Sequence, residues 1–235
     1  AFDEQLIADL GAACAELDAD ASVRVVVLAG RGKHFSAGAD LNWMKRASGF
    51  TEEENRADAR KFAGMLRALS DMSKPTVARV QGAALGGGTG LAAACDMAVA
   101  SLDAQFATSE VKFGIIPAVI SPYVLRAIGP RHALRYFQSG ERFSAQRALE
   151  MGLVTEVCER EQLDATIAQL IETLIGGAPL AQKAAKDLIA AVDGHPINDD
   201  ISEETAQRIA RQRATSEAKD GIAAFLEKRT PAWLL

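Results

Sequence analysis

The chain has 235 residues, a length that one hydrophobic core can serve without dividing into several domains. Hydrophobic residues make up 49% and charged residues 24%, as in ordinary globular proteins, and no run of about 18 uncharged apolar residues predicts a membrane span. The formal net charge of −5 and the lack of any Lys/Arg block argue against a nucleic-acid partner.

Cysteine usage points to a reducing compartment. Cys14, Cys95 and Cys158 form no Cys-x-x-Cys pair, and their apolar surroundings are typical of small core residues. No leader of charged and then apolar residues is present, so we expect a cytoplasmic protein. The chain begins inside a helix-like pattern. We therefore also expect a first strand, and any targeting signal, to precede Ala1 in the full-length protein.

The first half of the chain alternates helix-like and strand-like segments. Apolar residues recur at helical spacing from Phe2 to Leu17, and Thr51 with Glu54 forms a capping box for a second helix. Helices are predicted over 2–17, 52–71 and 91–95, and strands over 23–29, 76–80 and 97–100. Repeated strand–helix units joined by glycine loops predict parallel β-structure built from β-α-β units.

The second half becomes mostly helical. Ser121 is read as an N-cap followed by a proline in the first turn, and Ser144 as the cap of a helix that runs to Met151. One last strand is predicted over 154–157. Beyond Glu159 the pattern is helical, with breaks at 176–177 and 194–196.

Three consecutive glycines, Gly86 to Gly88, lie between a predicted strand and a predicted helix. Glycine permits positive φ and lets a ligand approach the backbone closely, and the first N–H groups of a helix can hold negative charge. The lysine of a phosphate loop and the glycine spacing of a dinucleotide fingerprint are both missing. A backbone oxyanion site is therefore the better interpretation, with a purely structural turn as the alternative.

Several ordered motifs carry a resemblance to a known family. His34-Phe-Ser-Ala-Gly-Ala-Asp-Leu41 and Val80-Gln-Gly-Ala-Ala-Leu-Gly-Gly-Gly88 resemble the signature of the crotonase superfamily, the enoyl-CoA hydratase/isomerase proteins. Further matches follow in register at 95–99, 104–111, 114–117 and 225–231. Segment 109–123 looks most like bacterial 3-methylglutaconyl-CoA hydratases and their relatives that act on isoprenoid glutaconyl-CoA thioesters.

The resemblance implies an α/β fold and an oligomer. The expected architecture is a crotonase-type spiral of ββα units over 1–163, which holds the acyl-CoA site. A helical C-terminal region over 164–235 is expected to mediate a homotrimer or a dimer of trimers. The predicted partner is an acyl-CoA thioester. No separate cofactor is expected, because coenzyme A enters as part of the substrate.

The resemblance also implies two backbone donors and one carboxylic acid. By motif, the amides of Ala39 and Gly87 hold the thioester oxygen while it carries enolate charge, each contributing about 10²–10³ in rate. Glu110 matches a catalytic glutamate that moves a proton at the α-carbon. Without the family match, a lone glutamate would more often be a surface charge. His34, His132 and His195 are not at metal-ligand spacing, so no metal site is predicted.

Position 90 departs from the hydratases that use two glutamates. Their first glutamate follows the three glycines as Gly-Gly-Gly-x-Glu, where this chain has Gly90. A β-carbon with two alkyl groups carries developing positive charge well, so water attack on such a substrate needs less help from a base. Ser109, Ser121, Tyr123 or the distal carboxylate of the substrate are the alternatives for activating water.

The remaining substrate positions are carried over by motif. They are expected to line the coenzyme A channel and the acyl site, with the last two reaching the nucleotide from a neighbouring subunit: Arg24, Ala37, Asp40, Leu41, Gly86, Gly90, Pro117, Tyr123, Phe225 and Lys228. Ordinary surface or core roles are the alternative for Phe225 and Lys228.

The leading interpretation is a lyase that adds water reversibly to a β-branched enoyl-CoA such as 3-methylglutaconyl-CoA, in leucine or acyclic isoprenoid breakdown. An enoyl-CoA isomerase or decarboxylase that uses the single Glu110 is the enzymatic alternative. A non-catalytic acyl-CoA-binding or RNA-binding protein of the same fold is the third, although the intact oxyanion motif argues against it.

Overall fold

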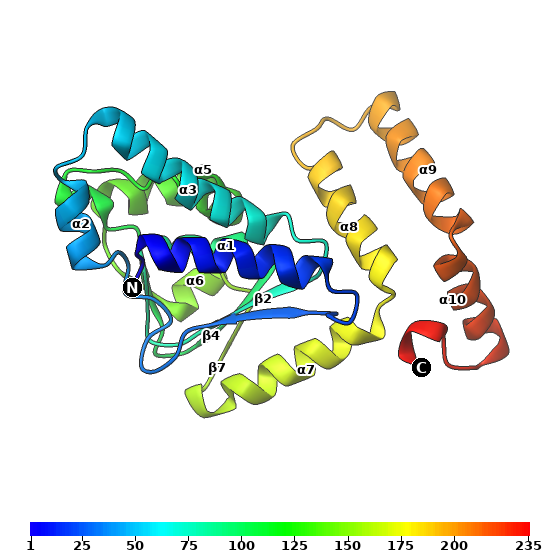
Figure 1. Ribbon diagram of the computed structural model, residues 1–235. Coiled ribbons are helices and arrows are strands. Elements are labelled where there is room, and N and C mark those ends of the chain that lie inside the picture. The colour runs from blue at the N-terminus through cyan, green and yellow to red at the C-terminus, as the bar shows by residue number, and fades with distance from the viewer.

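The computed structural model describes residues 1–235, and Figure 1 shows a layered α/β body with a helical C-terminal part. The helices are α1 (Glu4–Ala19), α2 (Leu41–Ala47), α3 (Glu52–Ser70), α4 (Gly87–Ala94), α5 (Ser121–Ser139), α6 (Ala145–Met151), α7 (Leu163–Gly176), α8 (Pro179–Val192), α9 (Asp199–Ala214) and α10 (Ser216–Glu227). Short 3₁₀ helices are η1 (Glu110–Phe113), η2 (Arg160–Gln162) and η3 (Ala232–Leu234). The strands are β1 (Val26–Ala29), β2 (Thr76–Val80), β3 (Ala83–Leu85), β4 (Met97–Ser101), β5 (Gln105–Ala107), β6 (Phe143–Ser144) and β7 (Glu156–Cys158).

The main sheet has four parallel strands in the order β1-β2-β4-β7. Side chains of β2 and β4 alternate between the two faces, as the period of two in a strand requires. Ala78 and Val80 face the large core, which includes Leu66 of α3, whereas Val77 and Val99 pack against α7. The strands are therefore buried on both faces, which explains their nearly continuous apolar sequence.

A smaller sheet in the order β3-β5-β6 stands beside the first. Strand β2 leads into β3 and β4 leads into β5 after only a few residues, so each turn of the chain adds one strand to each sheet before its helix. Strands β3 and β5 are parallel, while β6 pairs antiparallel with β5. The parallel, β-α-built architecture predicted from the sequence is confirmed.

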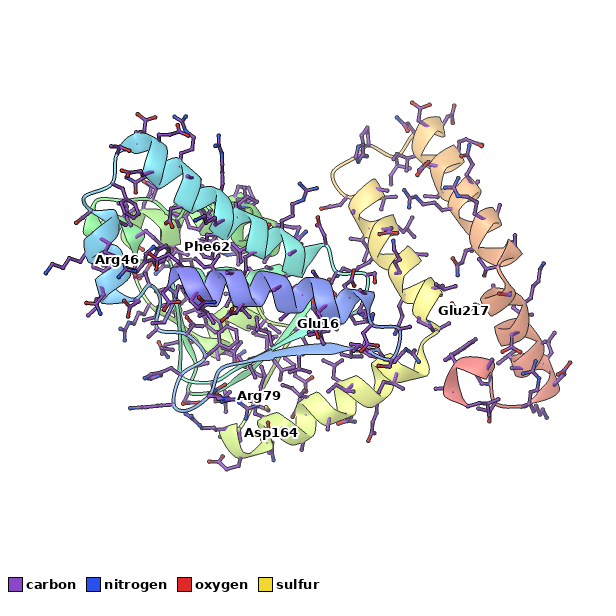
Figure 2. The ribbon with its side chains drawn as sticks, in the orientation of Figure 1. Glu16, Arg46, Phe62, Arg79, Asp164 and Glu217 are labelled. Carbon is purple, nitrogen blue, oxygen red and sulfur yellow. The ribbon has the colours of Figure 1, made fainter.

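The C-terminal helices differ in how they meet the sheet. Helix α7 packs through Leu163 and Ile167, and its Asp164 accepts from Arg79 of β2 at 2.5 Å (Figure 2). Helices α8 to α10 bury only Ala224, and Figure 1 shows α9 and α10 apart from the sheet. The Glu217 carboxylate caps α8 by accepting from its first N–H groups. Division of the chain at residue 164 stays a prediction.

Local corrections concern short elements and element ends. Helix α2 and strands β3 and β5 were not predicted, and neither was the break between α9 and α10. Strand β1 begins at 26 rather than 23, and β7 covers 156–158 rather than 154–157. Ile120, not Ser121, is the N-cap of α5, and the Ser121 hydroxyl donates to the Ala118 carbonyl at 2.7 Å. The capping box of Thr51 and Glu54 and the cap by Ser144 are confirmed.

None of the helices is both long and apolar enough to cross a lipid bilayer.

Candidate functional site

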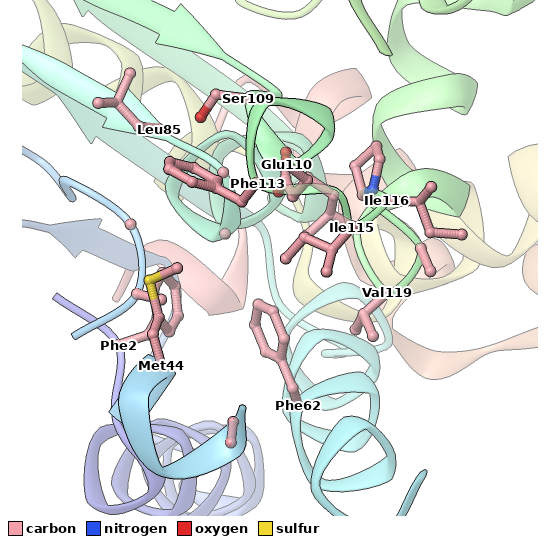
Figure 3. A pocket seen from close by; sticks show the side chains of 18 of the residues that line it. Phe2, Met44, Phe62, Leu85, Ser109, Glu110, Phe113, Ile115, Ile116 and Val119 are labelled. Atoms are coloured by element: carbon pink, nitrogen blue, oxygen red, sulfur yellow. The ribbon is translucent and has the colours of Figure 1, made fainter. Parts of the chain in front are cut away.

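A cavity of about 1130 Å³ lies where the 37–39 loop, the glycine loop and η1 meet α2 and α3. Figure 3 shows a mostly apolar interior around Glu110, with Phe2, Met44, Phe62 and Phe113 pointing into it. An elongated apolar cavity with few polar groups is typical of a site for a small organic ligand.

The first backbone donor in this cavity is Ala39. Phe2 donates its N–H to Gly38 at 2.8 Å and accepts from the N–H of Asp40 at 2.7 Å. The polar groups of the intervening Ala39 therefore point away from Phe2. The N–H of Ala39 has no acceptor within the protein, so it is available to a ligand. Gly38 makes this turn with a φ of +100°, a value that glycine adopts without strain.

The second donor is Gly87, the first residue of α4. Gly86 has a φ of +54° and turns the chain from β3 into the helix, where the first N–H groups have no partner inside the helix. A Cβ on Gly88 would lie 2.8 Å from the Ser36 carbonyl oxygen, so this position must be glycine. The close approach, together with the bridge between Ser36 and Ala84, holds the two donor segments side by side.

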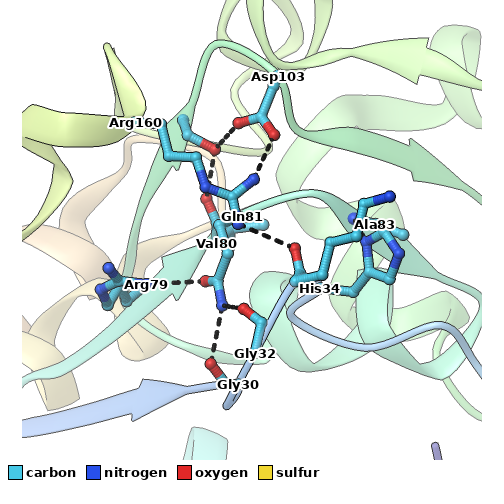
Figure 4. A network of polar contacts seen from close by, with 11 residues as sticks. Gly30, Gly32, His34, Arg79, Val80, Gln81, Ala83, Asp103 and Arg160 are labelled. Atoms are coloured by element: carbon cyan, nitrogen blue, oxygen red, sulfur yellow. Dashed lines mark hydrogen bonds and ion pairs between the residues drawn. The ribbon is translucent and has the colours of Figure 1, made fainter.

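A polar network behind the two segments fixes their register (Figure 4). The Gln81 side chain donates to the Gly30 carbonyl at 2.8 Å and accepts from Arg79 at 2.9 Å. The His34 ring accepts from the N–H of Ala83 at 3.0 Å through Nδ1. Sequence reasoning examined His34 only as a metal ligand and missed this supporting role, for which no local pattern gives a signal.

Glu110 is half-buried at the start of η1, beside the glycine loop. A Cβ on Gly86 would lie 3.2 Å from its Oε1, and its Oε2 is buried without a hydrogen-bond partner. Burial raises the pKa of this carboxyl, while a hydrogen bond from its own backbone N–H opposes the shift. The raised pKa favours the protonated form, which has a proton to donate next to the two amides.

Ile120 occupies the space next to Gly90. A Cβ on Gly90 would collide with Cγ2 of Ile120 and lie 2.7 Å from its Cβ. Ile120 is only 2% exposed and also lines the cavity. A side chain at position 90 is therefore excluded by packing, and this wall of the cavity is hydrocarbon.

The opposite wall carries polar groups that the sequence analysis did not single out. Asn55 and Asp58 of α3 line the cavity, and so does Trp43 of α2, whose buried indole nitrogen lies near the Asp58 carboxylate without reaching full hydrogen-bond geometry. Burial raises the pKa of Asp58. Trp43 was missed because α2 itself was not predicted, whereas Asn55 and Asp58 lie on the predicted helix over 52–71, where no local pattern shows that they face the cavity.

The structure brings about half of the predicted site residues together. Those that line the cavity are Ala37, Ala39, Leu41, Gly86, Gly87, Glu110 and Pro117. Asp40 instead caps α2 by accepting from Asn42 and Trp43, and Tyr123 packs against the core near Arg126. Of the groups considered for water activation, Ser109 lines the cavity and Ser121 and Tyr123 do not.

Four other predicted positions lie outside the cavity of this protomer, and one of them is Gly90, which packs behind Ile120. Arg24 donates to the carbonyls of Gly177 and Trp233 at 2.6 and 3.2 Å. Phe225, which is 83% exposed, and Lys228 are at the end of α10. No group of three or more His, Cys, Asp or Glu side chains is placed to ligate a metal ion.

The arrangement can polarise a carbonyl and move one proton. Ala39 and Gly87 line one cavity from separate segments, and neither N–H has an acceptor inside the protein, as the usual construction of an oxyanion hole requires. A carboxylic acid with a raised pKa lies beside them and can act on the carbon next to that carbonyl.

Comparison with known proteins identifies the family. Residues 1–234 match the enoyl-CoA hydratase/isomerase family. A crystal structure of an enoyl-CoA hydratase from Shewanella pealeana has a TM-score of 0.96 and 40% sequence identity, covering 99% of this chain and 87% of that one. Pseudomonas aeruginosa AtuE has a TM-score of 0.92 and 35% identity, covering 98% and 90%.

Comparison with curated protein sequences gives the same family. The 2,3-dehydroadipyl-CoA hydratase of Escherichia coli is 34% identical over 229 residues, which is 97% of this chain and 86% of that protein. The family resemblance seen in the motifs is thus confirmed over nearly the whole chain. The protein belongs to the enoyl-CoA hydratase/isomerase family and has the α/β crotonase fold, with β-α units and C-terminal helices.

Proposed function

We propose that the protein adds water reversibly to a β-branched enoyl-CoA such as 3-methylglutaconyl-CoA, with Ala39, Gly87 and Glu110 as its catalytic groups. Membership of the family makes it an enoyl-CoA hydratase-like lyase with an acyl-CoA substrate. The observation that carries the finer proposal is the packing of Ile120 against Gly90. It removes the second carboxylate and favours substrates whose β-carbon accepts water most readily.

The proposed reaction proceeds through an enolate. Water attacks the β-carbon, and the electrons of the double bond move onto the thioester oxygen, where the N–H groups of Ala39 and Gly87 stabilise them. Protonated Glu110 then delivers its proton to the α-carbon, and the proton lost by the water restores Glu110. One carboxyl thus both gives and receives a proton, with Ser109 available as a hydrogen-bond partner for the water.

A distal carboxylate on the substrate has support from a relative. The 2,3-dehydroadipyl-CoA hydratase, by its name, acts on the thioester of an unsaturated dicarboxylic acid. The cavity of this protein has both apolar and charged lining residues and can take an acyl group with a polar end. A glutaconyl-type substrate, such as those of leucine or isoprenoid breakdown, combines that polar end with the β-branch.

The substrate preference tests this proposal. With no carboxylate at position 90, crotonyl-CoA should be hydrated at least about a hundredfold less efficiently in kcat/KM than 3-methylglutaconyl-CoA, because a missing base costs about 10²–10⁴ where it is needed. The thioester contacts to Ala39 and Gly87 are common to both substrates and cancel in the ratio. Equal efficiencies at one pH would refute the argument.

Isomerisation is the second candidate, because moving a double bond needs only one proton-transferring group, and Glu110 is suitably placed. Product masses separate the candidates. Hydration adds the mass of one water, isomerisation leaves the mass unchanged, and decarboxylation lowers it. A mass gain with the β-branched thioester is the result we expect.

We further propose that the helices after α7 assemble a trimer or a dimer of trimers. Phe225 and Leu226 are 83% and 73% exposed, which leaves an apolar end of α10 for a second copy to cover. In that assembly Phe225 and Lys228 would reach the nucleotide end of a neighbour's substrate, while Arg24 and Asp40 would border the channel. Light scattering should give three or six chains per particle, and an active monomer would contradict this assignment.

A further inference from the structure

The two charged walls of the catalytic cavity have opposite signs. Asp58 lies on α3, while Lys112 of η1 and Arg142, just after α5, line the cavity from the other side. Between them the interior is apolar, as Phe2, Phe62 and Ile115 show in Figure 3. A charged substrate group in that interior would lose its water without gaining a partner, which is costly.

The two cations are not committed to partners inside the protein. Neither Lys112 nor Arg142 forms an ion pair, whereas the neighbouring Arg135 holds Glu141 at 2.6 Å. Glu110 forms no ion pair with either cation, and Glu141, which lies near Lys112, is already paired with Arg135. Two cations therefore face one unpaired carboxyl, and the net charge of this cluster is positive even with Glu110 ionised.

The backbone places the two cations next to each other, on the same side of the cavity as Glu110. Lys112 is two residues after Glu110, and its aliphatic chain crosses Gly140, where a Cβ would lie 3.2 Å from Cε. Gly140 has a φ of +57° and also lines the cavity, and Arg142 follows two residues later. The two side chains therefore belong to one corner of the cavity, formed by η1 and the end of α5.

We propose that Lys112 and Arg142 bind the distal carboxylate of a dicarboxylic acyl-CoA and so determine its specificity. The inference rests on the proposed function, because it names the part of that substrate which they recognise. Arginine and lysine form charge-assisted hydrogen bonds with carboxylates, and Asp58 on the opposite wall repels the same group. The acyl tail is thereby oriented toward η1 rather than toward α3, with the β-carbon next to Glu110.

Binding of unreactive thioesters tests the inference without any turnover. Glutaryl-CoA and pentanoyl-CoA have acyl chains of equal length and differ in a terminal carboxylate against a methyl group. Isothermal titration should show glutaryl-CoA bound at least about tenfold more tightly by the wild-type protein. The double variant Lys112→Gln/Arg142→Gln should lose this preference, with pentanoyl-CoA binding changed less than twofold.

The control variants separate local recognition from general charge. Lys45 is an exposed, unpaired cation on α2 outside the cavity lining, so Lys45→Gln should keep the preference. Asp58→Asn removes the opposing charge, so the preference for glutaryl-CoA should stay the same or increase.

Other outcomes overturn the inference. If the double variant bound both thioesters more weakly by the same factor, the cations would contact the coenzyme A phosphates instead. Equal binding by the wild type would mean that no carboxylate subsite exists. The hydration assay is independent of these measurements: if glutaryl-CoA is preferred but no thioester is hydrated, the carboxylate subsite stands and the proposed reaction fails.

Discussion

Replacing Glu110 by glutamine should lower kcat for hydration of the preferred thioester by about 10²–10⁴, the usual contribution of a positioned acid or base. Glutamine keeps the shape of the side chain but has no proton to exchange with the α-carbon. The N–H groups of Ala39 and Gly87 are untouched, so Kd for a saturated acyl-CoA should stay within about twofold. Stopped-flow or coupled absorbance assays would measure the first quantity and titration calorimetry the second.

Asp58→Asn is the matched control, because it removes another carboxylate of the same cavity, on α3. Its kcat should fall by much less than that of Glu110→Gln, because Asp58 helps to orient the acyl tail but exchanges no proton with the substrate. If Glu110→Gln retained most of the activity while Asp58→Asn lost it, the proton-transfer role would belong to Asp58 and the assignment of Glu110 would be wrong.

The stability of Glu110→Gln provides a second check with a defined sign. Burial raises the folded-state pKa of Glu110 above its ordinary value of 4.5, so ionisation of this group destabilises the folded protein as the pH rises above 4.5. Glutamine never ionises. The free energy of unfolding of the variant should therefore equal or exceed that of the wild type at pH 7, with the difference shrinking as the pH falls to about 4.

The second large effect concerns the packed pair Gly90 and Ile120. Gly90→Glu alone should destabilise the fold by about 1–3 kcal/mol or more, because its Cβ would collide with Ile120. Adding Ile120→Gly opens that space, and glycine is acceptable there because Ile120 is the N-cap of α5. The double variant should hydrate crotonyl-CoA at least about a hundredfold faster than Ile120→Gly alone.

Ile120→Gly is the matched control, since it carries the same cavity and the same loss of packing without the added carboxylate. Circular dichroism would establish that both variants fold. A folded double variant that hydrates crotonyl-CoA no faster than this control would mean that the geometry near position 90 cannot orient a water molecule. The active site of this chain would then differ from that of two-glutamate hydratases in more than the residues at positions 90 and 120.

The sequence predicted the backbone of the site better than its walls. The glycine loop and the 34–41 motif have local signals, because backbone donors and tight turns require glycine and small residues at set positions. Glu110 was predicted only through the family resemblance. The contact between Gly90 and Ile120 joins residues far apart in the chain, and no local pattern reports it. Lys112 and Arg142 looked ordinary, since only the folded chain places them in the same cavity.

Element prediction failed where the elements are short. Strands β3 and β5 have three residues each, which is too few to show the alternation of a strand. They pair with each other, Ala83 opposite Gln105, through residues that are distant in the sequence. Helix α2 spans 41–47, and its cap, Asp40, was read as a substrate contact. Long periodic helices and strands buried on both faces, by contrast, need no tertiary information to be recognised.

The segment between Asp40 and Thr76 can change without moving the two backbone donors proposed for catalysis. Strand β1 pairs directly with β2, and Ser36 with Ala84, so the register of both oxyanion amides is set outside this segment. Changing the length of such a connection has little effect on stability, because doubling the number of residues in a loop costs only about 0.6 kcal/mol of closure entropy. Segment 41–62, which carries Trp43, Asp58 and Phe62, can thus vary between relatives and reshape one wall of the cavity, whereas the proposed carboxylate contacts of Lys112 and Arg142 stay with the host chain.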